Sequence, residues 1–426
     1  MRLFAAKRSG KGKWILAHAA RVISTSKFPV AIFVVQWLVV YVGALAGLDV
    51  VPVSRSLSQF TKHAPSGSFF ASMFRWDSVS YLAIARDGYS FNGNFHQQQD
   101  IAFFPGYPLF LRLVHLLTES WSYASVELPN VALALVSIVV FYRLSQRFCA
   151  EGEARFVTAL FALYPGNMFF YSAYPAALAS FLVILSVSYF ASGRMTTGAM
   201  YAGLCTAVSP FSAFFSFGLF VSEVRRVQYL GLTTMAAVKT FWRFLGFGLL
   251  SLSGLLGFLV FQEIMYRNPF VFDRILGAWH YHLAFRDHLD YFLKVSWFGI
   301  NGSRFSSLWR MMAWQPYDKA KTYANLIGAI NAFSLAEIIL GSVFIIKYSR
   351  TLAAYGVLVV LVWAWYLGCY YGLYSTARIV SIGCPVVIGL SAIYRKSPYI
   401  ALAVLMISGV LLAVSSALFV ARYPVV

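Results

Sequence analysis

The sequence predicts an all-α, multi-pass integral membrane protein with about eleven transmembrane helices. Hydrophobic residues make up 60% of the 426 residues and charged residues only 12%, whereas a soluble domain needs roughly 25% charged residues to cover its surface. The mean hydropathy is +0.69. Apolar stretches such as Pro29–Val51 and Tyr399–Val420 are long enough to cross a hydrocarbon core of about 30 Å. Lipid must therefore cover much of the chain.

The apolar stretches also predict the order of the spans. They cover residues 29–51, 125–142, 156–172, 174–191, 196–208, 211–223, 244–266, 322–346, 352–374, 379–394 and 398–420. The first follows a basic lead and is not followed by a small-residue cleavage site, so we interpret it as a retained span. The segments around Ser209-Pro210 are short. The sequence is therefore compatible there with either a single kinked helix or a re-entrant pair of helices.

The positive charges predict the orientation of these spans. The net charge is +19, which in a soluble protein would suggest nucleic acid. Here a basic amino terminus precedes the first span, and placing it in the cytoplasm puts the basic residues of the short loops on the same side, namely Arg143, Arg147, Arg155, Arg194, Arg225, Arg226, Lys239, Arg243, Lys347, Arg350, Arg395 and Lys396. Arg422 and the two long loops are the exceptions, and the rule does not bind long loops. This distribution follows the positive-inside rule. We therefore predict contact with membrane lipids and no nucleic acid.

Residues 1–426 are expected to form one membrane domain with two long extracytoplasmic loops, 52–124 and 267–321. In the first loop, Trp76–Ala85 has apolar residues at Trp76, Val79, Tyr81, Leu82 and Ala85. This pattern predicts an amphipathic helix in the plane of the interface. The aromatic, turn-rich run Phe103–Pro108 predicts a loop or half-helix at the membrane surface. Ordered loops on one membrane face indicate a site that acts at that face.

Two acidic residues of the first loop are candidate catalytic groups. The whole chain has 15 acidic residues, and Asp77 and Asp100 lie in the loop predicted to be at the membrane surface. A carboxylate within about 3 Å of an acceptor hydroxyl can take its proton during sugar transfer. The alternative for Asp77 is a structural role, as the cap of the interfacial helix or the partner of Arg75. Asp87-Gly88 is interpreted as a helix end followed by a turn.

Other polar residues are candidates for binding rather than catalysis. Arg378 lies at the predicted extracytoplasmic mouth between two spans, where a guanidinium can bind a lipid phosphate bidentately. Its alternative is an arginine snorkelling to ordinary head groups. His280 lies in the second long loop close to His282 and His288. No third ligand follows at a zinc-site spacing, so we predict a substrate-contacting loop and no metal. The absence of a phosphate-cradling loop predicts that no nucleotide or other cofactor is used directly.

The first loop resembles a known family. The run Arg75–Tyr89 followed by Ile101–Leu109, with a second match over Leu163–Tyr174, is similar to the second mannosyltransferase of GPI-anchor synthesis (PIG-V-like) and its prokaryotic relatives. The resemblance implies a GT-C-type membrane fold and a polyprenyl- or dolichyl-phosphate mannose donor. It also implies a lipid-linked glycan acceptor, such as a GPI-type intermediate, and transfer that inverts the anomeric centre. We therefore predict an enzyme that transfers mannose, or a related hexose, at the extracytoplasmic face.

The resemblance also assigns roles to residues. Asp77 is the implied catalytic base, and Asp100 is the second candidate. Arg75, Trp76 and Tyr107 of the motif are predicted to bind substrate, together with Arg378 and His280. The resemblance implies the bacterial plasma membrane as the location if the host is prokaryotic, and the endoplasmic reticulum membrane if it is eukaryotic.

The chain departs from the family pattern at three places. Pro175-Ala176 follow Tyr174 where the family usually has a Ser/Thr-Glu pair. The chain reads Val-Ser-Pro-Phe at 208–211, where the family usually has an arginine before a polar-glycine pair. The family's late arginine-tyrosine pair is Arg378-Ile379 here. Two alternatives therefore stay open beside the enzyme: an inactive scaffold that binds a small membrane partner subunit, and a transporter of lipid-linked sugars. A transporter would need ionisable residues within the spans or broken helices in two matching halves, and the sequence has little of either.

Overall fold

The computed structural model describes residues 6–51, 69–209, 234–276, 319–363 and 376–423, and every regular element in these ranges is helical. Five of the described helices are long and apolar enough to cross a membrane, or up to seven if each of two bent helix pairs counts as one span. The protein is thus a multi-pass, helical membrane protein. The predicted number of about eleven spans is not confirmed, and the expected span 211–223 lies outside the described residues.

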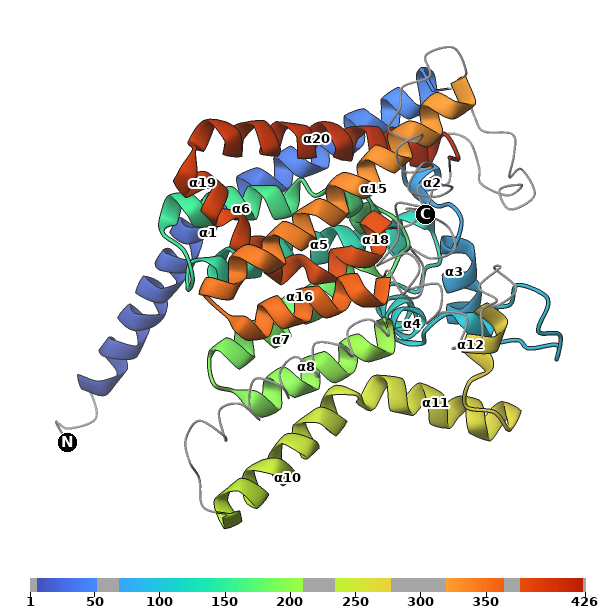
Figure 1. The fold of residues 1–426 in the computed structure, drawn as a ribbon, viewed down its shortest axis with the longest axis horizontal. Helices are drawn as coiled ribbons and strands as arrows, with labels where there is room; N and C mark the ends of the chain where they lie inside the picture. The colour runs from blue at the N-terminus through green and yellow to red at the C-terminus, as the bar shows by residue number, and fades with distance from the viewer. Residues whose placement is uncertain (1–5, 52–68, 210–233, 277–318, 364–375, 424–426) are drawn as a thin grey trace, which may run out of the picture.

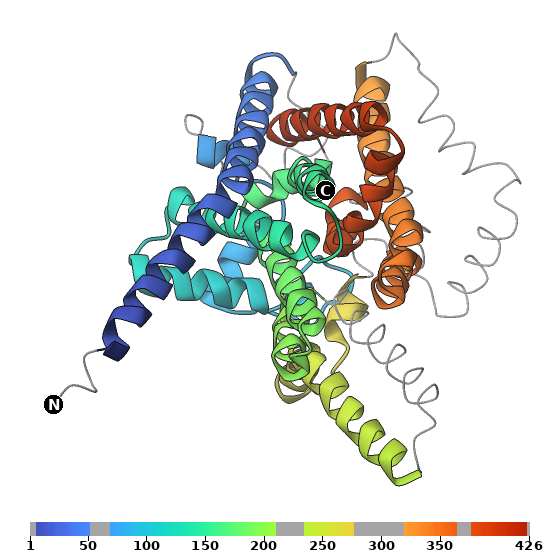
Figure 2. The ribbon, with the colours of Figure 1, turned by 90° about the vertical axis from the view of Figure 1, so that its left-hand side faces the viewer.

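The long elements in chain order are α1 (Ala6–Asp49), α5 (Tyr123–Ser145), α6 (Glu151–Ala162), α7 (Ala176–Ala191), α8 (Met195–Val208), α10 (Thr234–Ser251), α11 (Ser253–Tyr266), α15 (Lys319–Phe344), α16 (Arg350–Trp363) and α20 (Pro398–Val420). Between α16 and α20 lie α18 (Thr376–Val380), the 3-10 helix η8 (Ser381–Leu390) and α19 (Ser391–Lys396). Most of these helices run in one direction across Figure 1. Figure 2 looks along the bundle and shows α10 leaving it at one edge.

Helix α1 packs closely against α20 through two glycines. A Cβ atom at Gly43 would collide with the backbone of Ala413, and one at Gly47 would collide with the backbone of Ala417. Both helices therefore present small residues four positions apart. In lipid, where apolar side chains gain little by leaving their solvent, this pattern allows the close backbone approach that holds helices together. The contact places the last helix of the chain beside the first.

The chain breaks between α6 and α7, where the sequence predicted two uninterrupted spans. Pro165–Tyr171 forms the 3-10 helix η3, which meets α7 at an angle of 109°. Carbonyl groups exposed by such a break must find partners in a membrane. Gln36 of α1 donates to the Ala162 carbonyl at 2.6 Å, and Ser408 of α20 donates to the Leu163 carbonyl at 2.9 Å. The bend is therefore stabilised by buried side chains of two other helices.

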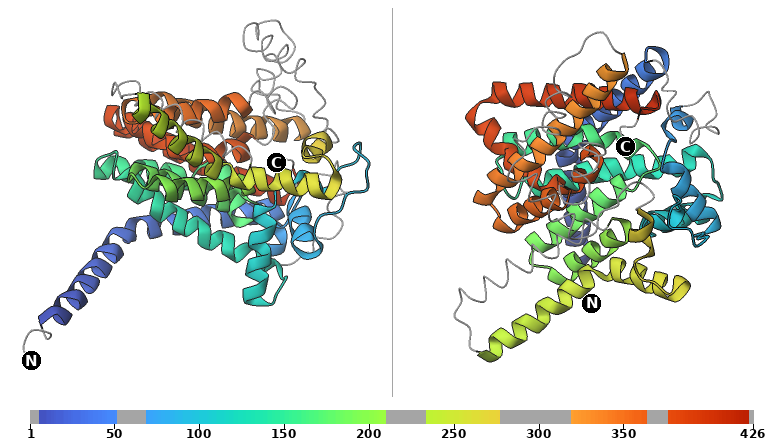
Figure 3. Two further views of the ribbon diagram at one scale, coloured as in Figure 1. Left: turned by 90° about the horizontal axis from the view of Figure 1, so that it is seen from below. Right: turned by 45° about the vertical axis from the view of Figure 1, so that its right-hand side comes forward.

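Three short helices gather at the end of the bundle where α1 ends. They are α3 (Ser78–Asp87), α4 (Gly106–Thr118) and α12 (Val271–Leu276). Helices α3 and α4 run across the direction of the long helices (Figures 1 and 3). A small apolar cluster that includes Ile101, Phe104 and Phe258 joins the first loop to α11 and α12. Elements that lie across a bundle end suit a membrane interface.

The predicted interfacial helix is real, but its start and its buried face differ from the expectation. It begins at Ser78 because Trp76 has a left-handed backbone conformation, with φ of +53°. Its buried residues are Ser78, Tyr81, Ile84 and Ala85, whereas Val79 is 51% exposed. The helix ends at Asp87, and Gly88 follows with φ of +85°, as predicted. The packed face therefore includes Ile84 beside Tyr81 and Ala85, and it leaves out Val79.

Candidate active site

An ion pair joins the two residues that the sequence singled out independently. The Nη1 atom of Arg378 donates to the Oδ2 atom of Asp77 at 2.6 Å, across 301 residues of sequence. Both side chains are partly accessible, with exposed fractions of 22% for Arg378 and 23% for Asp77. Asp77 makes no side-chain cap on α3. The predicted alternative roles, helix cap and partner of Arg75, are therefore not those seen in the structure.

The backbone conformation of Trp76 separates the two charged residues on either side of it. Arg75 is 6% exposed, and its Nη1 atom donates to the carbonyls of Ala71 at 3.0 Å and Phe74 at 3.2 Å. These carbonyls belong to the end of helix α2 (Phe69–Met73) and the residue after it. Burial, with the nearby charge of Arg422, lowers the pKa of Arg75 to about 10. Arg75 thus stays charged at neutral pH and stabilises the turn beneath Asp77.

A left-handed conformation costs free energy in any residue with a side chain, on the order of 1–3 kcal/mol at such positions. Trp76 adopts it immediately before the carboxylate. The Tyr174 hydroxyl accepts from the Asp77 backbone N–H at 3.1 Å and donates to the Arg75 carbonyl at 3.4 Å. This hydroxyl therefore bridges the strained turn from both sides. Backbone strain that is fixed by its surroundings is typical of functional sites.

Aromatic rings pack beneath the ion pair. The Tyr81 ring lies 5.2 Å from the Tyr107 ring and 6.2 Å from the Tyr174 ring, and Tyr107 is fully buried. The Nδ2 atom of Asn130, on α5, donates to the Tyr107 hydroxyl at 2.8 Å and to the Ser172 carbonyl at 2.5 Å. Burial and the Asp77 charge raise the pKa of Tyr81. Its hydroxyl therefore remains protonated beside the carboxylate.

Arg378 is positioned through the residue before it. The Ala377 N–H donates to Oδ1 of Asn331 on α15 at 2.9 Å, and the Ala377 carbonyl accepts from the Tyr164 hydroxyl at 3.1 Å. A Cβ atom at Gly166 would collide with that same carbonyl. The guanidinium also lies over the Tyr174 ring, 5.4 Å from its centroid. The segment Leu163–Tyr174 therefore holds Arg378 against Asp77.

The remaining predicted site residues differ in how the structure places them. Asp100 begins the 3-10 helix η2 (Asp100–Ala102), and Ser80 of α3 is a hydrogen-bond partner of its side chain. Burial raises its pKa, an effect that the bond to Ser80 partly offsets. His280 lies outside the described residues. In the part of the chain that is described, no group of three His, Cys, Asp or Glu side chains is arranged to hold a metal ion.

Sequence reasoning missed three buried polar residues around the site. Glu127 on α5 is fully buried and interacts electrostatically with Arg75. Asn130 lies one turn further along the same helix, and Asn331 lies on α15, both with 0% exposure. The signal was available, because a polar side chain inside an apolar span is expensive and usually has a function or a partner. Hydropathy alone reflects the apolar length of a span and does not single out these residues.

Comparison with known proteins identifies the family. Residues 39–282, more than half of the chain, match the family model described as Mannosyltransferase (PIG-V). The match includes Asp77 and Tyr174 but ends before Arg378. The chain is 33% identical over 144 residues to GPI alpha-1,6-mannosyltransferase 2 of Cricetulus griseus, covering 32% of this chain and 28% of that protein.

Two further similarities complete the comparison. The protein of the same name from Rattus norvegicus is 32% identical over 164 residues, covering 33% of this chain and 31% of that protein. The chain thus spans less than a third of the curated relatives that it matches. Among solved structures, the Archaeoglobus fulgidus oligosaccharyltransferase overlaps 91% of this chain and 53% of its own, with a TM-score of 0.46 and 12% identity.

Proposed function

Because the chain belongs to the PIG-V mannosyltransferase family, we propose that it transfers mannose from a polyprenyl- or dolichyl-phosphate carrier to a hydroxyl of a lipid-linked glycan. The observation that carries the proposal is the ion pair between Asp77 and Arg378. It combines a group that can take a proton with a group that can bind a phosphate. The two side chains are partly exposed, unlike the buried side chains of Arg75 and Glu127 around them.

The proposed chemistry follows from these two groups. The acceptor hydroxyl oxygen forms a bond to C1 of mannose while an Asp77 oxygen takes its proton. The bond between C1 and the phosphate oxygen breaks, and the lipid phosphate leaves with the electron pair. Attack from the side opposite the leaving group inverts the anomeric centre. No nucleotide takes part in this scheme.

Arg378 serves the leaving group in this scheme. A guanidinium has five N–H donors, and one N–H of Nη1 is directed at Asp77. The other donors remain for phosphate oxygens, and charge-assisted bonds of this kind are about twice as strong as neutral ones. The same side chain would hold the base and neutralise the charge that develops on the phosphate. Arg75 and Tyr107, which are buried, would support the site from beneath.

The site lies where a lipid-borne substrate would be accessible. Helices α3 and α4 lie across the end of the bundle, as expected for elements in the interface plane. The turn between α7 and α8, which contains Arg194, and helix α19, which ends with Arg395 and Lys396, lie at the opposite end of the bundle (Figure 1). By the positive-inside rule, this supports an extracytoplasmic site. We propose a GT-C-type arrangement in which the donor's apolar tail remains in the bilayer while its phosphate binds Arg378.

The proposal is tested with the purified full-length chain, radiolabelled polyprenyl- and dolichyl-phosphate mannose, and lipid-linked glycan acceptors. We expect label in the acceptor lipid, and none when dolichyl-phosphate glucose replaces the mannose donor. Donor binding without transfer to any acceptor would instead support the inactive scaffold. Movement of the donor lipid between leaflets of a vesicle, without transfer, would support the transporter.

A further inference from the structure

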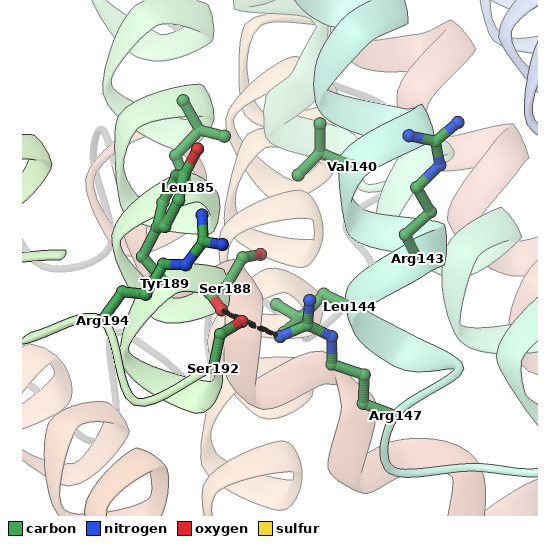
Figure 4. A pocket seen from close by; sticks show the side chains of 9 residues that line it. All are labelled: Val140, Arg143, Leu144, Arg147, Leu185, Ser188, Tyr189, Ser192 and Arg194. Atoms are coloured by element: carbon green, nitrogen blue, oxygen red, sulfur yellow. Dashed lines mark hydrogen bonds between the residues drawn. The ribbon is translucent and has the colours of Figure 1, made fainter. Parts of the chain in front are cut away.

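A second polar region lies near the end of the bundle opposite Asp77. It is a cavity of about 470 Å³ between α5, α7 and the turn that joins α7 to α8. Its lining consists of Val140, Arg143, Leu144, Arg147, Leu185, Ser188, Tyr189, Ser192 and Arg194 (Figure 4). Three of these nine residues are arginines and none is acidic. The proposed transfer reaction uses none of them.

One of the arginines is fixed by hydrogen bonds. Nη1 of Arg147 donates to the Ser188 carbonyl at 2.9 Å and to the Ser192 hydroxyl at 2.6 Å. In Figure 4, Arg147 and Arg194 approach the two serines from opposite sides, while Arg143 stands further along α5 at the rim. The bonds to Ser188 and Ser192 hold the guanidinium within the cavity. Its remaining N–H donors are available to a ligand.

The charge of this cavity is not balanced by acidic side chains. Other arginines at the same end are paired: Arg155 with Glu151 at 2.9 Å, and Arg395 with Glu153 at 3.6 Å. Within the described ranges, no ion pair is found for Arg143 or Arg194. Several guanidinium groups close together repel one another. An anion bound between them would relieve this repulsion and form charge-assisted hydrogen bonds.

The apolar part of the lining indicates what carries the anion. Val140 and Leu144 belong to α5, which is one of the candidate spans, and Leu185 belongs to α7. Val140 and Leu185 precede the polar lining residues of α5 and α7, both of which end at this side of the bundle, so the inner part of the lining is apolar. A ligand that matches both parts has a charged head and a hydrocarbon tail. Basic pockets between transmembrane helices bind the head groups of anionic lipids in this way.

We propose that this cavity binds the phosphate head group of an anionic phospholipid, with Arg147 and Arg194 as the principal contacts and Arg143 at the rim. The site is separate from the Asp77–Arg378 pair and lies near the other end of the helices. Its occupation would tie α5 to the α7–α8 turn. The competing explanation is ordinary attraction of surface arginines to head groups, which requires no cavity.

The test compares two double variants that remove the same charge from the same end. The first double variant, Arg147→Gln with Arg194→Gln, removes the two arginines that are proposed to contact the phosphate. Arg155→Gln with Arg395→Gln removes two arginines that are paired elsewhere. Native mass spectrometry of the full chain measures the affinity for phosphatidic acid and for phosphatidylcholine. We expect wild type to prefer phosphatidic acid and the first variant to bind it about 25-fold more weakly, about fivefold for each arginine, with less than about a twofold change in the second.

Equal losses in the two double variants would overturn the proposal, as would a wild type without preference for phosphatidic acid. The unfolding midpoint in phosphatidylcholine shows whether each variant is folded. If the first double variant does not fold, Arg194→Gln alone serves instead, with an expected loss of about fivefold. Inorganic phosphate is the second arm. Displacement of the lipid by millimolar phosphate assigns recognition to the phosphate group alone, and no displacement assigns it to the whole lipid; either result supports the site.

Discussion

The two motifs that identified the family contribute to the site in different ways. The first, Arg75–Pro108, supplies the carboxylate of Asp77, which is partly exposed and paired with Arg378. The second, Leu163–Tyr174, supplies no exposed charged group. Its Tyr164 and Gly166 contact the Ala377 carbonyl, and its Tyr174 bridges the turn at Trp76. The first motif therefore carries the proposed chemistry, and the second fixes the geometry in which that chemistry takes place.

This difference shows why a motif match does not by itself identify reacting groups. A sequence match does not distinguish a tyrosine that positions a backbone from a carboxylate that takes a proton. Substituting the two residues should have different effects on the reaction rate and on folding. Loss of a base should affect the rate and leave folding intact, whereas loss of a positioning contact should act through the group that it positions, which for Tyr164 and Gly166 is Arg378. Three substitutions, in order of decreasing effect, test this distinction.

Asp77→Asn should have the largest effect on turnover. The amide keeps the shape of the side chain but cannot take a proton, and loss of a positioned base typically costs 10²–10⁴-fold in rate. We expect transfer at least about a hundredfold slower, with donor binding and the unfolding midpoint little changed. Asp87→Asn, at the exposed end of the same helix, is the control and should cost little. Turnover above about a tenth of wild type would remove Asp77 from the role of base.

Gly166→Ala should have a smaller effect, transmitted through Arg378. The new Cβ atom would collide with the Ala377 carbonyl, so the backbone that carries the guanidinium must move. Because misplacement by about 1 Å can cost up to 10²-fold, we expect turnover to fall about tenfold or more. Gly257→Ala on α11, where no atom lies within 4 Å of the added carbon, is the control.

A positioning role for Gly166 also predicts how its substitution combines with loss of Arg378. In an Arg378→Gln background, Gly166→Ala should have almost no additional effect on turnover, because the group that it displaces is already absent. A full additional tenfold loss in that background would mean that Gly166 acts on folding or on another group.

Asp100→Asn should have the smallest effect of the three, and that effect should be on stability rather than on turnover. Burial raises the pKa of Asp100, so the folded protein binds more protons than the unfolded chain between the two pKa values. Stability therefore falls as pH rises through that window and stays lower at neutral pH. Removing the charge should raise the unfolding midpoint at pH 7 by on the order of 1 °C. A lower midpoint would contradict this, and a hundredfold loss of turnover would make Asp100 a second catalytic carboxylate.

Local patterns in the sequence single out Asp77 and Arg378 as candidates but do not predict the contact between them. Asp77 and Arg378 were each predicted from their surroundings in the sequence. Their pairing was not, because Arg75 lies only two residues from Asp77 and is an equally good partner by type. The structure excludes it because the left-handed conformation of Trp76 directs Arg75 to the carbonyls of α2. Nothing in the residue type of a tryptophan indicates that conformation.

The helical class is confirmed, whereas the predicted number of spans is not, and the reason is physical. Hydropathy measures apolar length but not continuity. The expected spans 156–172 and 244–266 are long and mostly apolar, yet the first divides at Pro165 and the second bends by 61° between α10 and α11. Side chains from distant helices, such as Gln36 and Ser408, stabilise the first break. A break whose partners lie far away in the sequence cannot be read from the local pattern.

The central claim is that Asp77 and Arg378 act as one unit, and a double-mutant cycle on turnover tests it most directly. Rates are measured for wild type, Asp77→Asn, Arg378→Gln and the double variant, with the same lipid-phosphate mannose donor. Residues that act as a unit are strongly non-additive. We expect the double variant to be about as slow as the slower single variant, with a coupling energy of about 1–3 kcal/mol. Rate losses that multiply, giving a coupling energy near zero, would show that the two residues act independently and would contradict the account.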